Sequence, residues 1–175
     1  MIETLISSKT RIKMLLKFFL NGNNKGYLRG LEQEFGESSN AIRLELNRFE
    51  KAGMLKSYTE GNKKFFQANK KHPLFNEVHN IVLKQIGFDR IINQVITRLG
   101  DVQKVYVTGE FAKGLNSQII DLTFVGNVNH RYLHELCKKV EKLIGRKIRF
   151  VIFDTIDEIN WTSRDSDPLI LWENV

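Results

Sequence analysis

Two histidines and one cysteine in the second half of the chain have a spacing that could bind a metal ion. His130, His134 and Cys137 follow one another at i, i+4 and i+7, which places them along one side of a helix, and imidazole and thiolate are common zinc ligands. However, Cys137 lies about 40° from an apolar stripe that includes Leu133 on the same helix, so we expect it to pack as a small core residue. The sequence therefore predicts no metal site.

A second group of side chains could contact nucleic acid. In a predicted helix that begins near Ser38 or Ser39, the apolar residues Ile42, Leu46 and Phe49 define the buried face. At about 100° per residue, the opposite face carries Asn40, Arg43, Leu44, Asn47 and Lys51. Arginine can form two hydrogen bonds with guanine, asparagine can do the same with adenine, and leucine can contact the thymine methyl group. These side chains predict a helix that binds double-stranded DNA in the major groove.

Other residues of the same half could hold the DNA backbone. Ser39 and the free amide groups at the start of this helix could bind a phosphate. Further cations could neutralise phosphates and make binding depend on salt, namely Lys9, Arg11, Arg48, Lys63 and Lys64.

The distribution of charge supports a polyanionic partner for the first half alone. The chain has 175 residues and a formal net charge of +7. Residues 1–86 contain 15 Lys and Arg against 8 Asp and Glu, whereas residues 87–175 contain 12 of each. Because the whole excess lies in one half, we expect one module to meet nucleic acid and the other not to. A basic surface that serves only solubility is the alternative.

The composition excludes several classes of protein. A hydrophobic content of 42%, a charged content of 27% and only two prolines are typical of a folded globular protein. The apolar runs are too short to span a membrane, and the N-terminus shows no signal-peptide pattern. A single cysteine excludes an intramolecular disulfide framework. We expect a cytoplasmic protein with no membrane partner and no cofactor.

Periodicity predicts three helices and a hairpin in residues 1–70. The first helix is capped by Ser8, the second ends at Gly36, and the third ends at Ala52-Gly53. Two extended segments, 54–59 and 63–68, flank a glycine-containing turn and indicate a β-hairpin. Three helices followed by a hairpin are typical of a winged helix-turn-helix DNA-binding domain.

The remainder predicts a linker helix over 71–87 and a small α/β domain over 88–175. In the second domain we expect strands at 103–107, 119–125 and 147–153, with a helix at 129–144 between the last two strands. The last strand is apolar on both faces, so we expect a largely buried sheet. A short helix is predicted over 167–172, and the amphipathic helices 74–85 and 88–99 are the candidates for dimerisation. The expected fold class is thus α+β overall, with an α/β C-terminal domain.

The first half resembles the ArsR-type winged-helix transcriptional regulators. The resemblance lies in Ser8-Lys9-Thr10-Arg11, in Tyr27-Leu28-Arg29, and in the segments from Glu45 to Leu55 and from Glu60 to Phe66. Asn69 and His72-Pro73-Leu74-Phe75 are similar to the subset in which this domain is fused to a nucleotidyltransferase-like domain, and residues 103–153 look like that second domain. The resemblance implies a transcriptional regulator, and a homodimer would place two recognition helices one DNA turn apart.

The second domain departs from the motif of the nucleotidyltransferases that it resembles. In that family a strand leads into Gly-Ser and a further Gly, and three carboxylates on later strands hold two Mg²⁺ ions. Here the first element is Gly109-Glu110-Phe111-Ala112-Lys113-Gly114, with Glu110 in place of the serine. Only Asp121 remains of the Asp-x-Asp pair, and Arg149 stands at the third carboxylate position. The resemblance therefore implies a degenerate domain that is not an enzyme, with Arg149 ion-paired to Asp121 or Glu110.

Three alternatives stay open. Gly109, Lys113, Gly114 and Arg149 could bind a nucleotide or another small anionic effector without a metal ion, so that the domain senses instead of reacting. The chain could be an active nucleotidyltransferase, of toxin–antitoxin type, that is targeted by its winged helix. It could also be a protein-interaction adaptor without affinity for DNA.

Overall fold

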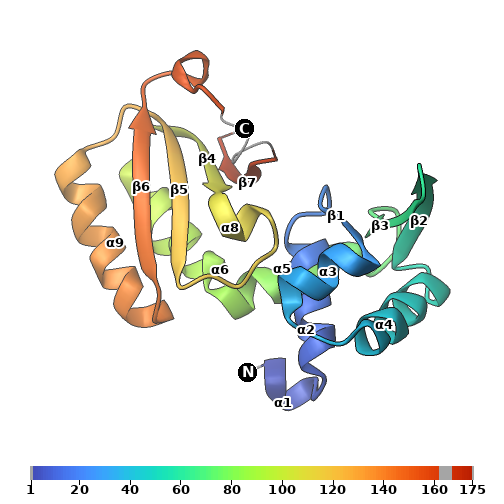
Figure 1. The fold of residues 1–175 in the computed structure, drawn as a ribbon. Coiled ribbons are helices and arrows are strands. Elements are labelled where there is room, and N and C mark those ends of the chain that lie inside the picture. Colours follow the sequence, from blue (N-terminus) through green and yellow to red (C-terminus); the bar gives the residue numbers. More distant parts are fainter. Residues whose placement is uncertain (1, 162–166, 175) are drawn as a thin grey trace. The chain divides into compact units, whose positions relative to one another are not determined.

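Contacts within the chain divide it into two units, residues 1–82 and residues 83–175. The structure is a computed structural model that describes residues 2–161 and 167–174 (Figure 1). It is a mixed α+β fold with two sheets, one in each unit. None of the described helices is long and apolar enough to cross a membrane.

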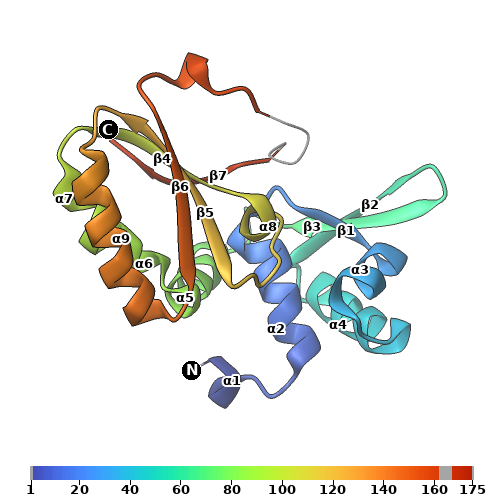
Figure 2. The same ribbon diagram turned by 60° about the vertical axis from the view of Figure 1, so that its left-hand side comes forward.

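The N-terminal unit combines a group of helices with a three-stranded antiparallel sheet. Its elements are α1 (Ile2–Leu5), α2 (Lys9–Leu15), the π-helical segment η1 (Leu16–Leu20), β1 (Lys25–Tyr27), α3 (Leu28–Phe35), α4 (Ser39–Lys51), β2 (Leu55–Glu60) and β3 (Lys63–Ala68). The strand order is β1-β3-β2. The hairpin formed by β2 and β3 projects from the helices of this unit (Figure 2). A further helix, α5 (Phe75–Ile86), contains the division between the units.

Local signals place the ends of these helices. The Ser8 side chain accepts a hydrogen bond from the Arg11 amide at 3.2 Å and caps α2. Ser38 does the same for α4 by accepting from the Ala41 amide at 3.3 Å, so the cap is Ser38 and not Ser39. Gly36 ends α3 in the left-handed conformation. The predicted helices and hairpin of this half are therefore present, and their apolar faces form one buried core around Phe18, Leu31, Ile42 and Leu46.

The C-terminal unit is a four-stranded sheet with helices on one face. Its elements are α6 (Phe88–Ile91), the π-helical segment η2 (Ile92–Ile96), α7 (Thr97–Leu99), β4 (Val102–Thr108), α8 (Gly109–Ala112), β5 (Ile119–Gly126), α9 (His130–Ile144), β6 (Lys147–Phe153), the 3₁₀ turn η3 (Ile156–Glu158) and β7 (Leu169–Glu173). The strand order is β6-β5-β4-β7. β5 and β6 are parallel and are connected through α9, which lies along the sheet (Figure 1), whereas β4 pairs antiparallel with both β5 and β7.

One expectation for this unit is wrong, and another holds only in part. Residues 167–172 do not form a helix, because Leu169–Glu173 is the edge strand β7, paired with β4. The expectation of a largely buried sheet holds for the central strands β4 and β5, which carry consecutive buried residues, but not for β6. Phe150 faces α9, where its ring lies 6.3 Å from that of His134, but Val151 points to the other face of the edge strand β6 and is 51% exposed. The apolar run therefore belongs to a half-covered edge strand and not to a central one.

Candidate functional site

A basic groove in the N-terminal unit is the first candidate site. It has a volume of about 480 Å³ and lies between the start of α3, α4 and the hairpin. Its lining consists of Tyr27, Leu28, Arg29, Arg43, Leu46, Asn47, Asn62, Lys63, Lys64 and Phe66. Among the described residues, this lining contains four cations and no carboxylate. Such a groove suits an anionic ligand that also offers hydrogen-bonding groups.

The structure places the predicted outward face of α4 on the surface. Ile42, Leu46 and Phe49 are buried. The residues predicted to contact DNA from this helix are exposed, namely Ser39, Asn40, Arg43, Leu44, Asn47, Arg48 and Lys51. Leu44 is 47% exposed, which is unusual for leucine in the middle of a polar surface. Of these seven residues, Arg43 and Asn47 line the groove.

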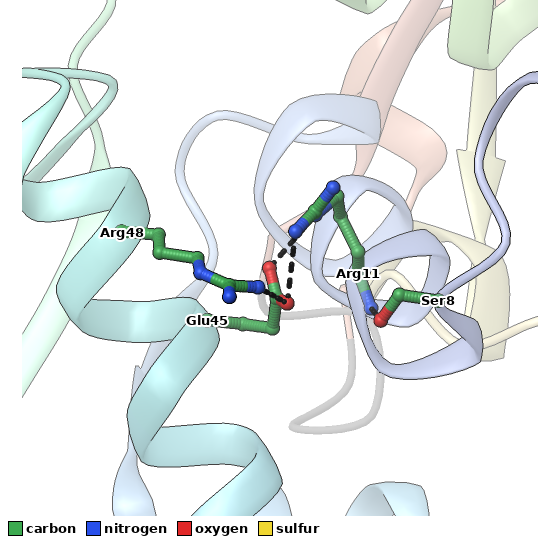
Figure 3. A network of polar contacts seen from close by, with 4 residues as sticks. All are labelled: Ser8, Arg11, Glu45 and Arg48. Carbon is green, nitrogen blue, oxygen red and sulfur yellow. Dashed lines mark hydrogen bonds and ion pairs between the residues drawn. The ribbon is translucent and has the colours of Figure 1, made fainter.

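Arg11 and Arg48 have a different role from the predicted contacts with phosphate. The carboxylate of Glu45 on α4 is only 4% exposed, and it accepts hydrogen bonds from Arg11 Nε at 2.8 Å, Arg11 Nη2 at 3.1 Å and Arg48 Nη1 at 2.8 Å (Figure 3). Burial by itself would raise the pKa of Glu45, but the hydrogen bonds and charges of the two arginines outweigh it and hold this pKa below its ordinary value. The cluster joins α2 to α4, and it uses two of the cations that we assigned to the DNA backbone.

The two hairpin lysines also differ from each other. Lys64 forms an ion pair with Glu50 of α4 at 2.9 Å, and Glu50 also accepts a hydrogen bond from the Ser57 hydroxyl. This pair ties the hairpin to α4. Lys63 instead places its ammonium group 4.5 Å from the centre of the ring of Tyr27, and both residues line the groove. Among the ion pairs of the described residues, Lys64 has a carboxylate partner and Lys63 has none.

Sequence reasoning missed Tyr27, Arg29 and Asn62, which also line the groove. Tyr27 and Arg29 come from β1 and the start of α3, and β1 is a three-residue strand that pairs with β3. A strand of this length has no periodicity of its own, so only its pairing reveals it. The motif Tyr27-Leu28-Arg29 was nevertheless among the residues that carry the family resemblance, and it was the one available signal.

The second candidate site lies where β4 enters α8 in the C-terminal unit. Asp121 on β5 is the register partner of Thr108, the last residue of β4, and of Arg149 on β6. Arg149 donates from Nε to Asp121 Oδ1 at 2.7 Å and from Nη2 to Oδ2 at 3.0 Å, which is the ion pair that the sequence predicts. The hydrogen bonds and charge of Asp121, with a smaller contribution from the charge of Glu110, raise the pKa of Arg149.

Gly109 lies directly against this ion pair. Its φ is +65°, and a Cβ atom there would come within 2.6 Å of Asp121 Oδ2, so a side chain at this position would be strained and would displace the Asp121 carboxylate. Gly109, Glu110, Asp121 and Arg149 are thus brought together. Lys113 and Gly114 follow at the end of α8, where Lys113 is exposed and Gly114 is buried.

The residues of this site do not fit the pair of magnesium ions that the resemblance implies. Both oxygens of Asp121 are bonded to Arg149, and Mg²⁺ needs several hard anionic oxygens around it. Among the described residues, no group of three or more His, Cys, Asp and Glu could hold a metal ion. We therefore derive no chemical step through a metal.

His130, His134 and Cys137 lie on different sides of α9. Both histidines are exposed beside the ring of Phe150, whereas Cys137 is 3% exposed on the inner side of the helix. Burial raises the pKa of the Cys137 thiol to about 12, which disfavours the thiolate that a metal ion would need.

A second basic hollow, at the end of α9, was not foreseen. Its volume is about 550 Å³, and it is lined by Gln118, Lys138, Lys139, Glu141, Lys142, Gly145, Arg146 and Lys147. Arg146 donates to the carbonyl of Ser117 and, at 2.9 Å, to Asn116 Oδ1, and its burial lowers its pKa. The zero net charge of residues 87–175 concealed this concentration of cations, because acidic residues elsewhere in that half balance it.

Comparison with known proteins gives matches at the level of structure alone. No protein-family model and no curated protein matches the chain. AF1382 from Archaeoglobus fulgidus matches at 18% identity over 47% of this chain and 93% of that chain, with a TM-score of 0.39. A tri-AMPylated HEPN toxin in complex with MNT antitoxin, from Shewanella oneidensis, matches at 14% identity over 52% and 73%, with a TM-score of 0.39. TrmBL2, an archaeal chromatin protein with a novel mode of DNA binding, matches at 13% identity over 84% and 72%, with a TM-score of 0.27.

One expectation is corrected by this comparison. Several of the matched structures are MntA and MNT toxin–antitoxin proteins, one with AMP-PNP and one with an AMPylated toxin, and this finding contradicts the prediction that the chain is not an enzyme. That prediction rested on the loss of two carboxylates and of one serine from the family motif. Their loss argues against the magnesium-dependent mechanism of that family, but it does not argue against every enzymatic reaction.

Proposed function

We propose that the N-terminal unit is a winged helix-turn-helix of the ArsR type and that the protein is a DNA-binding transcriptional regulator. The observation that carries this proposal is the basic groove, where Arg29, Arg43, Asn47 and Lys63 converge from three elements with no carboxylate in its described lining. The order of α2, α3, α4 and the β2–β3 hairpin supports it, because α4 then corresponds to a recognition helix and the hairpin to the wing.

Each part of the groove has a distinct role in this proposal. Arg43 and Asn47 lie one turn apart on the exposed face of α4 and reach base edges in the major groove. Arg29 and Lys63 flank them and contact phosphates, which position the helix without selecting a sequence. Lys64 and Arg48 stabilise the unit through their glutamate partners and contribute less to the contact with DNA.

The replacement Arg43→Ala tests this function. The loss of a two-bond contact with a base should weaken binding to the preferred duplex by about 1–3 kcal/mol and relax the choice of base at one position. Preferred duplexes are first selected from random DNA at near-physiological salt, and affinities are then measured by fluorescence anisotropy. Arg131→Ala is the matched control, because Arg131 is a 93% exposed arginine of the C-terminal unit. Equal affinities of wild-type protein and Arg43→Ala for every duplex would contradict the proposal.

We also propose that the regulator is a homodimer. Leu74, which directly precedes α5, and Ile81 on α5 are 54% and 50% exposed, and exposed large apolar side chains favour association. In the other segment that the sequence offered for dimerisation, 88–99, Phe88 and Ile91 are fully buried and so are not available to a partner. Light scattering at micromolar concentration measures the mass directly, and a monomer would contradict this part of the proposal.

Nucleotidyl transfer is a second candidate function, and one observation favours it. Gly109 turns from β4 into α8 directly against Asp121 on the neighbouring strand, as in the motif that the C-terminal unit resembles. Transfer of label from a nucleoside triphosphate to a protein or small-molecule acceptor, abolished by Asp121→Asn, would support it. Wild-type protein that neither transfers label nor binds nucleotides would exclude both this function and a nucleotide effector.

A further inference from the structure

Three aromatic rings form a row across the sheet of the N-terminal unit. Tyr27 on β1, Phe65 on β3 and Tyr58 on β2 are partners in the strand register. The ring centres of Tyr27 and Phe65 are 5.3 Å apart, and those of Tyr58 and Phe65 are 5.8 Å apart with an angle of 19° between the rings. The Tyr58 and Phe65 rings are therefore nearly parallel, and we call the three aromatic side chains the aromatic row.

The aromatic row lies on the face of the sheet that points away from the core. Neighbouring residues in a strand point to opposite faces, and the next position in the register consists of Gly26, Phe66 and Ser57. Phe66 is buried, and the Ser57 hydroxyl bonds Glu50 of α4, so that face packs on the helices. The opposite face carries the aromatic row, in which Tyr58 is 36% exposed.

Cations accompany the row. The Lys63 ammonium group lies 4.5 Å from the centre of the Tyr27 ring, and the Lys25 ammonium group lies 5.6 Å from the centre of the Tyr58 ring. Lys56 shares this face of β2 with Tyr58 and is exposed. Aromatic faces are thus interleaved with long, flexible cations on a sheet surface.

We propose that the aromatic row binds a single strand of nucleic acid, with unpaired bases stacked on Tyr58 and Phe65. Every base has a π-face, and stacking on an aromatic ring is stronger than an exposed lysine–ring contact, so a base can displace the ammonium group from the ring. Lys56 and Lys63, which lie on the same face of the sheet, can then contact the phosphates that accompany the bases. The bases of an intact duplex are already stacked on one another, so this surface selects single strands.

The aromatic row shares Tyr27 and Lys63 with the groove, but it adds a surface that the groove lacks. The groove uses α4, whereas Tyr58 and Phe65 are absent from the described lining of the groove. Cross-strand aromatic pairs also stabilise a sheet. If the aromatic row served only this structural purpose, any apolar side chain of similar size would suffice. Replacing Tyr58 by leucine keeps an apolar side chain at the position and removes the flat ring, so it separates stacking from packing.

Binding of a fluorescein-labelled oligothymidine of about 12 nucleotides, a typical site size, tests the proposal with the full chain. We expect Tyr58→Leu to weaken this binding about tenfold, Tyr58→Phe to retain it, and Tyr58→Leu to keep the wild-type affinity for a duplex. Thermal unfolding by circular dichroism shows whether each variant is folded. Wild-type protein that fails to bind the single strand, or Tyr58→Leu that binds it as tightly as wild type, would overturn the proposal.

Photocrosslinking of the wild-type protein tests the same point without a variant. A single strand that contains 5-iodouracil forms adducts with stacked aromatic side chains, which peptide mass spectrometry can locate. Adducts at Tyr58 or Phe65 support the aromatic row, and adducts confined to α4 overturn it. Failure of the duplex experiment with Arg43→Ala would concern the groove alone, because neither single-strand experiment depends on that residue.

Discussion

Replacing Gly126 with alanine is expected to destabilise the C-terminal unit strongly. Gly126 ends β5 with a φ of +127°, a conformation that L-residues rarely adopt, and a Cβ atom there would lie 2.4 Å from the carbonyl oxygen of Asp101 and 3.0 Å from the amide nitrogen of Gln103. Both obstacles are backbone atoms, so no side chain can move aside. Backbone strain and overpacking together should cost about 3–5 kcal/mol, which is a large part of the stability of a typical domain.

Tryptophan fluorescence measures this effect in one unit alone. The two tryptophans of the chain, Trp161 and Trp172, both belong to the C-terminal unit, so their emission during unfolding in urea reports its free energy of unfolding. Gly145→Ala is the matched control, because Gly145 also has a positive φ, of +68°, but a Cβ atom there meets nothing within 4 Å. We expect that control to lose about 1 kcal/mol. Equal losses of unfolding free energy in the two variants would contradict the explanation that a side chain at Gly126 clashes with the neighbouring backbone.

Replacing Arg11 with alanine is expected to destabilise the N-terminal unit by about 2–4 kcal/mol at neutral pH. The Glu45 carboxylate is 4% exposed and would lose two of its three hydrogen bonds to guanidinium groups, so a buried charge would be left with Arg48 alone. Urea unfolding followed by far-UV circular dichroism measures the loss. Arg48→Ala is the control, and its smaller expected loss of about 1 kcal/mol follows from the single bond and the 57% exposure of that side chain.

The same cluster predicts how this loss depends on pH. In the wild-type protein the arginines outweigh burial and lower the pKa of Glu45, so their contribution is present above the unfolded pKa of about 4.3 and is lost as the pH falls through the lower folded value. Without Arg11, burial raises the pKa of Glu45, and the carboxyl group takes up a proton more readily. The difference between variant and wild type should therefore be largest at pH 7 and shrink below about pH 4. A difference that is independent of pH would contradict the role of this ion pair.

The fold was predictable where the signal lies within a few residues. Ser8 and Ser38 cap helices through bonds to amides three positions ahead, and the burial of Ile42 and Leu46 follows from helical spacing. The strand at Leu169–Glu173 was mistaken for a helix because a short apolar run fits either structure, and pairing with β4 decides between them. The same limit hid β1, whose three residues become a strand only beside β3.

The candidate sites, like the fold, could be predicted only where the signal lies within a few residues of the sequence. Arg43 and Asn47 could be found because they belong to one helix face, whereas Arg29 reaches the groove from a different helix. The role of Arg11 was mistaken because its partner, Glu45, lies 34 positions away in the sequence and is buried on α4. A charged side chain on a helix surface is expected to meet solvent or a ligand, and only the three-dimensional structure shows that this one meets an internal carboxylate.

The ion pairs inside the N-terminal unit have a consequence for the rate of association. Glu34, Glu37, Glu45 and Glu50 are each bound to a cation of the same unit, so these four acids do little to cancel the electric field of Arg29, Arg43 and Lys63 at the groove. A field of one sign extends beyond the range of direct contact and raises the frequency of productive encounters with a chain of phosphates. Diffusion itself therefore favours a phosphate-bearing strand over a neutral partner before any hydrogen bond is made.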